Sequence, residues 1–165
     1  MNVEKILYEF VTSDTWLQDR ATVKTSIRSI IKDWKYRLGM GDWQIKISYY
    51  REKYMATCYA EPEYGKAWLN FYLKRVMAEN HSNYDLEELV VHELCHCHSW
   101  PLVSLTEDLI NTVEDPTGRL LKSKEDYEEL LISKMGHALV MSKYGLTEVP
   151  DTVRIIGWEG LGKRR

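Results

Sequence analysis

The sequence predicts an α+β fold in a single domain of 165 residues, with a helix first, strands next and two helices last. Changes in the spacing of apolar residues predict this order. Residues 21–38 and 124–143 place apolar side chains every three or four positions, as in a helix buried on one face. Residues 43–73 instead contain short runs rich in aromatic and β-branched residues, which are typical of strands.

The first helix is expected to end before Gly39 and Gly41, because glycine commonly terminates helices. Its apolar positions form one stripe: Val23, Ile27, Ile30, Ile31, Trp34 and Leu38. An earlier segment, VEKILYEF, could form a further short helix, which the polar TSDT would close.

Three strands are expected over residues 43–73. In the first, apolar and polar residues alternate from Trp43 to Tyr49, as in a half-buried strand. The segments MATCYA (55–60) and KAWLNFYL (66–73) flank EPEYG, whose proline and glycine favour a turn. Connections this short predict a meander of neighbouring strands.

Two helices are expected to follow. The polar NHSNYD offers N-cap residues for a helix over 85–98, and Trp100-Pro101 should end it, because the residue before proline disfavours the helical conformation. The last helix is expected over 124–143, before Gly145. The domain is therefore expected to span residues 1–145. The tail, 146–165, has no assigned role, although its VRIIGW could form a strand.

Composition argues against several classes of partner. The net charge of -3 gives no general attraction to nucleic acid or anionic lipid. No apolar run approaches the roughly 18 residues that span a bilayer. Three cysteines, an odd number, do not form a disulfide framework. A cytoplasmic location is expected, with no membrane and no nucleic acid as partner.

The segment VVHELCHCHSW contains the strongest chemical signal, the pattern H-E-x-x-H at His92, Glu93 and His96. Residues four apart on a helix point in nearly the same direction, so the two imidazoles can bind one metal ion. In this motif the ion is zinc, and Glu93 projects beside it as the general base. We expect one Zn²⁺ per chain.

The other soft side chains of this segment cannot converge with both histidines on an intact helix. Cys95 and Cys97 are expected to be packing residues, and His98 an outer or surface histidine. Upstream, Glu88 and Asp85 share the face of the ligands. Either could orient an imidazole, or both could be ordinary acids of a first helical turn.

A catalytic zinc site needs a third protein ligand, and Glu128 is the preferred candidate. It precedes four apolar residues at helical spacing, Leu131, Ile132, Met135 and Leu139, and a buried carboxylate there would need a partner.

Alternatives to Glu128 remain open. Glu129 and Glu125 are the main ones, Glu114 and Asp115 fall on a loop, and all the helical acids could form a solvated first turn. His137 faces the opposite side of the helix and is not expected to be a ligand.

Several segments together resemble the small zincin-like metallopeptidases of phages and bacterial mobile elements. These segments are GDWQIKI, YAEPEYGKAWLNFYL, LEELVVHELCHC and YEELLISKMGHALV, within roughly residues 20–143. The resemblance implies a minimal zincin-like core of the gluzincin type, with His92, His96 and Glu128 as zinc ligands and Glu93 as catalytic base. It also implies that strand 66–73 lies at the cleft edge and pairs with an extended polypeptide substrate. A phage-encoded member would act in the host cytoplasm.

The expected activity is zinc-dependent peptide-bond hydrolysis. The competing hypothesis is a non-catalytic, zinc-binding regulatory or protein-interaction module that keeps the zincin frame. Replacing Glu93 by Gln separates the two hypotheses, because only hydrolysis requires the base.

Overall fold

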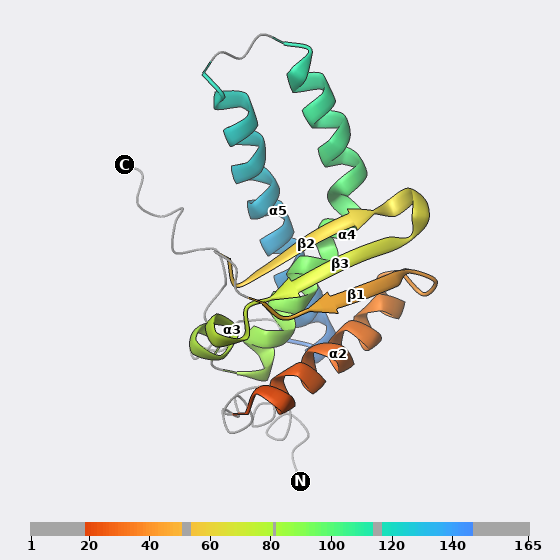
Figure 1. Ribbon diagram of the computed structural model, residues 1–165, viewed down its shortest axis with the longest axis vertical. Helices are drawn as coiled ribbons and strands as arrows, with labels where there is room; N and C mark the ends of the chain where they lie inside the picture. The colour runs from red at the N-terminus through yellow and green to blue at the C-terminus, as the bar shows by residue number, and fades with distance from the viewer. Residues whose placement is uncertain (1–18, 51–53, 81, 114–116, 147–165) are drawn as a thin grey trace.

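The computed structural model describes residues 19–50, 54–80, 82–113 and 117–146, and it confirms the α+β class (Figure 1). The elements are α2 (Arg20–Arg37), β1 (Gln44–Ser48), β2 (Ala56–Glu61), the 3-10 turn η1 (Pro62–Tyr64), β3 (Lys66–Phe71), α3 (Leu73–Glu79), α4 (Asn83–Asn111) and α5 (Arg119–Tyr144). The expected early helix VEKILYEF, the strand VRIIGW and nearly all of the tail lie outside the described residues.

Helix α2 forms where the sequence predicts it. The side chain of Asp19 caps it by accepting a hydrogen bond from the Thr22 backbone N–H at 2.9 Å. The predicted apolar stripe faces inward, and the helix buries Val23, Ile27, Ile31 and Trp34. Gly39 follows with a positive φ of 69°, a conformation that suits glycine.

The sheet has the predicted three strands, but the meander was wrong. The strand order is β1-β3-β2, with β1 parallel to β3 and β2 antiparallel to it. Strand β3 takes the centre because Ala67, Leu69 and Phe71 are all fully buried, and a central strand has neighbours on both sides to provide that burial. The backbone of β3 therefore has no free edge for a peptide, and the edge beside α4 belongs to β2.

Helix α4 is longer than predicted, because it continues through Pro101 to Asn111. Proline has no N–H, so the helix lacks one hydrogen bond, at the carbonyl of Cys97. Packing against α5 offsets this loss. Lys124 of α5, for example, donates to Glu107 beyond the proline at 2.6 Å.

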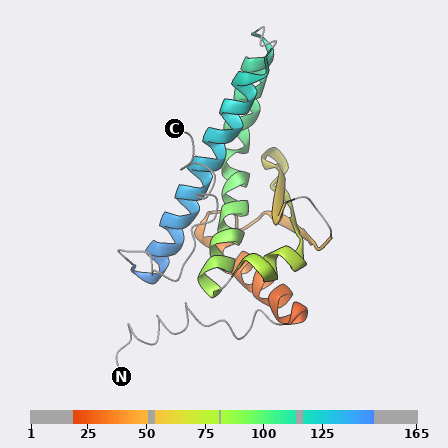
Figure 2. The same cartoon turned by 90° about the vertical axis from the view of Figure 1, so that its left-hand side faces the viewer.

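Helices α4 and α5 run antiparallel, and their connected ends project beyond the sheet (Figure 2). Figure 2 also shows α4 between α5 and the strands, so side chains of α4 can face both. Helix α3 was not predicted, and its first residue, Leu73, was expected to end the third strand. Leu73 and Val76 of this helix are buried.

The core joins α2, the inner face of the sheet, α4 and α5. Four acidic residues of α4 are buried with it: Asp85, Glu87, Glu88 and Glu93. Of these, Glu87 accepts hydrogen bonds from Trp34 Nε1 and Tyr144 Oη and forms an ion pair with Lys143. This cluster connects α2 and the end of α5 to the first turns of α4.

Among the described residues, no helix is long and apolar enough to cross a membrane.

Candidate metal centre

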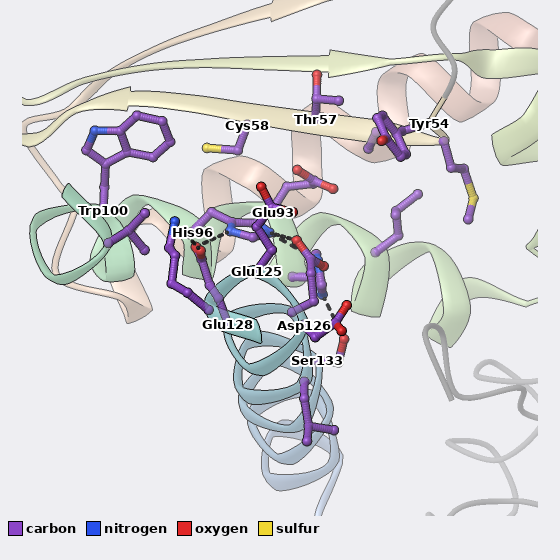
Figure 3. A pocket seen from close by; sticks show the side chains of 18 of the residues that line it. Tyr54, Thr57, Cys58, Glu93, His96, Trp100, Glu125, Asp126, Glu128 and Ser133 are labelled. Carbon is purple, nitrogen blue, oxygen red and sulfur yellow. Dashed lines mark hydrogen bonds and ion pairs between the residues drawn. The ribbon is translucent and has the colours of Figure 1, made fainter. Parts of the chain in front are cut away.

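Three potential ligand atoms meet where α4 faces α5. Nε2 of His92 lies 3.2 Å from Nε2 of His96. Glu129 places its Oε2 3.3 Å from the first nitrogen and its Oε1 3.4 Å from the second. These three residues form a group that could hold a metal ion, and it is the one such group found among the described residues. Figure 3 shows the surrounding pocket.

The spacing of the donors suits a small tetrahedral ion. Bonds of 2.0–2.1 Å to zinc would place neighbouring donors roughly 3.3 Å apart in a tetrahedron. The two Nε2 atoms, 3.2 Å apart, match that value, and each lies at a similar distance, 3.3 or 3.4 Å, from a different oxygen of Glu129. Two imidazoles and one carboxylate are also a donor set that leaves a fourth position open. The types of donor and their closeness therefore fit a zinc ion.

The close packing of α5 on α4 brings Glu129 to the histidines. Ile132, Ser133, Gly136 and Val140 are the buried residues of α5, and Glu129 precedes them at helical spacing. A β-carbon on Gly136 would lie 3.4 Å from the His92 backbone nitrogen, so this close approach has room for a side chain no larger than a methyl group.

The face of α5 inferred from the sequence was rotated from the true one. Leu131 and Met135, taken as inward-facing, are 51% and 41% exposed. The acid that joins the two histidines in the candidate metal group is therefore Glu129, an alternative that the sequence left open, and not the expected Glu128. The small residues Ser133 and Gly136 were the signal that could have identified the face.

Glu128 instead lies on the other side of His96. Its Oε1 is 3.3 Å from His96 Nδ1 and accepts a hydrogen bond from Ser99 Oγ at 3.3 Å, while Lys124 Nζ lies 3.5 Å from its Oε2. With Nδ1 as the donor, Nε2 of His96 is left unprotonated and free to bind a metal. Glu125, the other helical alternative, lines the pocket outside the triad, and Glu114 and Asp115 lie outside the described residues.

His92 is oriented from α5. Its Nδ1 lies 3.4 Å from Ser133 Oγ, so the imidazole planes of both histidines are held through their Nδ1 atoms. Glu88, expected as an orienting residue, is buried and pairs with His137 Nδ1 at 3.1 Å. Asp85 is also buried. His137 is thus an outer residue, and it does not join the triad.

The pKa values of the three triad residues are shifted by burial and by their charged neighbours. Burial lowers the pKa of His92, but the hydrogen bond to Glu129 and nearby carboxylates outweigh this and raise that pKa above its usual value. The pKa of His96 is lowered, first by burial and then by His92. The hydrogen bond from His92 lowers the pKa of Glu129. The carboxylate of Glu129 is thereby kept ionised, as a metal ligand must be.

Glu93 is buried beside this group, at 5% exposure, and it lines the pocket. Burial raises its pKa to about 7, with Glu129 adding to the increase and His92 opposing it. A carboxylate with a pKa near neutrality can accept and release a proton at physiological pH. This is the property that the H-E-x-x-H motif requires of its glutamate.

The remaining soft residues of the motif helix are separated from the triad. Cys95 and Cys97 are buried, as expected of packing residues, and His98 is exposed. Cys97 packs against Cys58 of β2, with the sulfur atoms 3.5 Å apart. The sequence contained no signal for that contact, because it depends on the sheet lying against α4.

The triad opens into a pocket of about 830 Å³, within the size range of ligand sites. Its walls are β2, α4 and α5, and its lining includes Thr57, Cys58, Trp100 and Glu93 (Figure 3). An edge strand therefore forms one wall of the pocket that contains the triad.

Comparisons of the chain with models of known protein families, with curated proteins and with solved structures find no match.

Proposed function

We propose that the protein is a zinc-dependent metallopeptidase. The observation that carries the proposal is the meeting of the His92, His96 and Glu129 donors at zinc-like spacing, with the buried Glu93 beside them. A zinc ion held there would act as a Lewis acid on a carbonyl oxygen and would acidify a water molecule.

The chain's own residues supply the proton transfers. Glu93, as a carboxylate, accepts a proton from the attacking water and later delivers it to the amine that leaves. Burial of Glu93 supports this role, because its raised pKa makes both transfers accessible near pH 7. Glu128 and Ser133 hold the imidazoles by their Nδ1 atoms and keep the Nε2 atoms aimed at the ion.

The polypeptide substrate is proposed to bind along β2. The sequence pointed to residues 66–73 for this strand pairing, but β3 is hydrogen-bonded on both sides. Strand β2 is paired on one side in the described sheet and lines the pocket, so its other edge is the place where a peptide can add in extended form.

The test compares wild type with Glu93→Gln, using the full chain. Zinc per chain is measured by mass spectrometry, and cleavage is measured on a mixed peptide library. We expect about one zinc in both proteins and at least a 100-fold loss of cleavage in the variant, because the amide cannot accept the proton. Glu125→Gln is the matched control, since it removes a pocket carboxylate outside the triad.

Zinc-loaded, folded wild type that cleaves no faster than Glu93→Gln would refute the peptidase. The protein would then be the non-catalytic zinc-binding module that the sequence also allows. Wild type that folds without binding zinc would overturn both readings.

A further inference from the structure

Two thiols face each other between the sheet and the motif helix. The sulfur of Cys58, on β2, lies 3.5 Å from the sulfur of Cys97, on α4. Figure 3 shows Cys58 projecting from its strand toward α4. The three cysteines of the chain are all free, and two of them are therefore in van der Waals contact across two elements far apart in sequence.

An oxidant can reach one member of this pair through the pocket. Cys58 is partly buried and belongs to the pocket lining, whereas Cys97 is 1% exposed. Cys95 is also buried, but it lies two positions from Cys97 and points about 200° away around the helix. Cys58 and Cys97 are therefore the pair that can react with each other, and Cys95, on the same helix as Cys97, serves as a control.

Two features of the backbone near the sulfurs bear on the movement that a bond requires. A disulfide has an S–S distance of about 2.05 Å, so the sulfurs must approach by roughly 1.5 Å. Strand β2 is paired on one side in the described sheet. The Cys97 carbonyl lacks its helical hydrogen bond, because Pro101 has no N–H to donate.

We propose that Cys58 and Cys97 are a redox modification site that forms a reversible intramolecular disulfide with a peroxide oxidant. The Cys58 sulfur, as thiolate, attacks one peroxide oxygen, so that the O–O bond breaks, Cys58 becomes a sulfenic acid and water leaves. The Cys97 sulfur then attacks the Cys58 sulfur, the S–O bond breaks and a second water leaves.

Overall, two thiols and one hydrogen peroxide become one disulfide and two water molecules, with two electrons passing from the sulfurs to the peroxide. A dithiol reductant reverses the change by exchange. The hydrogen bond to Cys97 and burial raise the pKa of the Cys58 thiol. Little thiolate is then present and the thiolate is a poor leaving group, so we expect both oxidation and reduction to be slow.

The bond would join β2 to α4 one residue after His96. The bond would fix the distance between two walls of the pocket, β2 and α4, at that point. The present contact between the two thiols is not covalent and does not fix that distance. The proposal does not depend on metal binding or on hydrolysis, since it rests on the positions of the two sulfurs.

The test treats the folded full chain with hydrogen peroxide and then blocks remaining thiols with iodoacetamide. Intact mass and peptide mapping are compared for wild type, Cys58→Ser, Cys97→Ser and Cys95→Ser, with circular dichroism to confirm folding. We expect wild type and Cys95→Ser to lose two hydrogens and to yield one peptide pair joined through residues 58 and 97. Both single variants of the pair should lack this product, and dithiothreitol should restore the thiols.

Intermolecular dimers, links to Cys95, or sulfinic acid at Cys58 without a cross-link would each overturn the proposal. If Cys97→Ser does not fold, Cys58→Ser decides alone, because residue 58 lies on the edge strand and is partly exposed.

Discussion

Gly136 packs directly on the backbone of His92: a β-carbon at 136 would be 3.4 Å from the His92 nitrogen and 3.5 Å from its Cα. Alanine fits at this limit, but the branched side chain of valine does not. We expect Gly136→Val to move α5 outward and to weaken zinc binding at least 10-fold, because Glu129 is carried away from the histidines. Gly136→Ala is the control, with nearly normal affinity. A competition titration with a zinc-sensitive dye measures both, and equal affinities would show that this contact does not position the triad.

Glu129 and Glu128 are neighbours that contact different nitrogens of His96, and matched substitutions test the different roles that we propose for them. Glu129→Ala removes a donor and should lower zinc affinity about 100-fold or more. Glu128→Ala removes the hydrogen-bond partner of His96 Nδ1 and should lower it by about 10- to 100-fold, the range for an outer partner of a metal ligand. Isothermal titration gives both constants. A larger loss for Glu128→Ala would return the third ligand to that residue.

Glu88 should make stability depend on pH. Burial raises the pKa of its carboxyl to about 8, with Asp85 adding to the increase and His92 opposing it. Between the unfolded value near 4.5 and the folded value, the native state binds more protons than the unfolded chain. The free energy of unfolding must therefore fall as pH rises through this window.

The matched variant is Glu88→Gln, which keeps a hydrogen-bonding group beside His137 but does not titrate. Between pH 5 and 8, metal-free wild type should lose on the order of 2–4 kcal/mol more than the variant. Urea unfolding at several pH values measures this difference. Parallel curves for the two proteins would exclude Glu88 as the source of the dependence.

The two carboxylates that meet Lys143 should differ in their effect on stability. Glu87 is almost fully buried and also accepts hydrogen bonds from Trp34 and Tyr144, whereas Asp33 is 41% exposed. Glu87→Leu leaves three donors without their buried acceptor, and we expect a loss of about 3 kcal/mol. Asp33→Asn should cost at most about 1 kcal/mol. Chemical denaturation compares them, and similar losses would contradict a structural role for the buried cluster.

Local signals predicted the parts of the fold that depend on one segment alone. The spacing of Val23, Ile27, Ile31 and Trp34 determines the buried face of α2. The spacing of His92 and His96 places both imidazoles on one side of α4.

Features that depend on contacts between distant segments could not be predicted in the same way. The central place of β3 depends on which strand the helices bury most completely. The passage of α4 through Pro101 depends on support from α5. The rotation of α5 was misjudged because Leu131 and Met135 are apolar but exposed, while the buried face contains Ser133 and Gly136.

The donors of the triad are divided between two helices that a loop connects at their far ends. A bound ion is therefore a cross-link that closes the projecting hairpin at its base, and an unfolded chain cannot hold it with the same affinity. At a free ion concentration one hundred times the dissociation constant, it would add about 2.7 kcal/mol to the free energy of unfolding. The concentration of free zinc would then determine the stability of the hairpin formed by α4 and α5, as well as whether the pocket contains a Lewis acid.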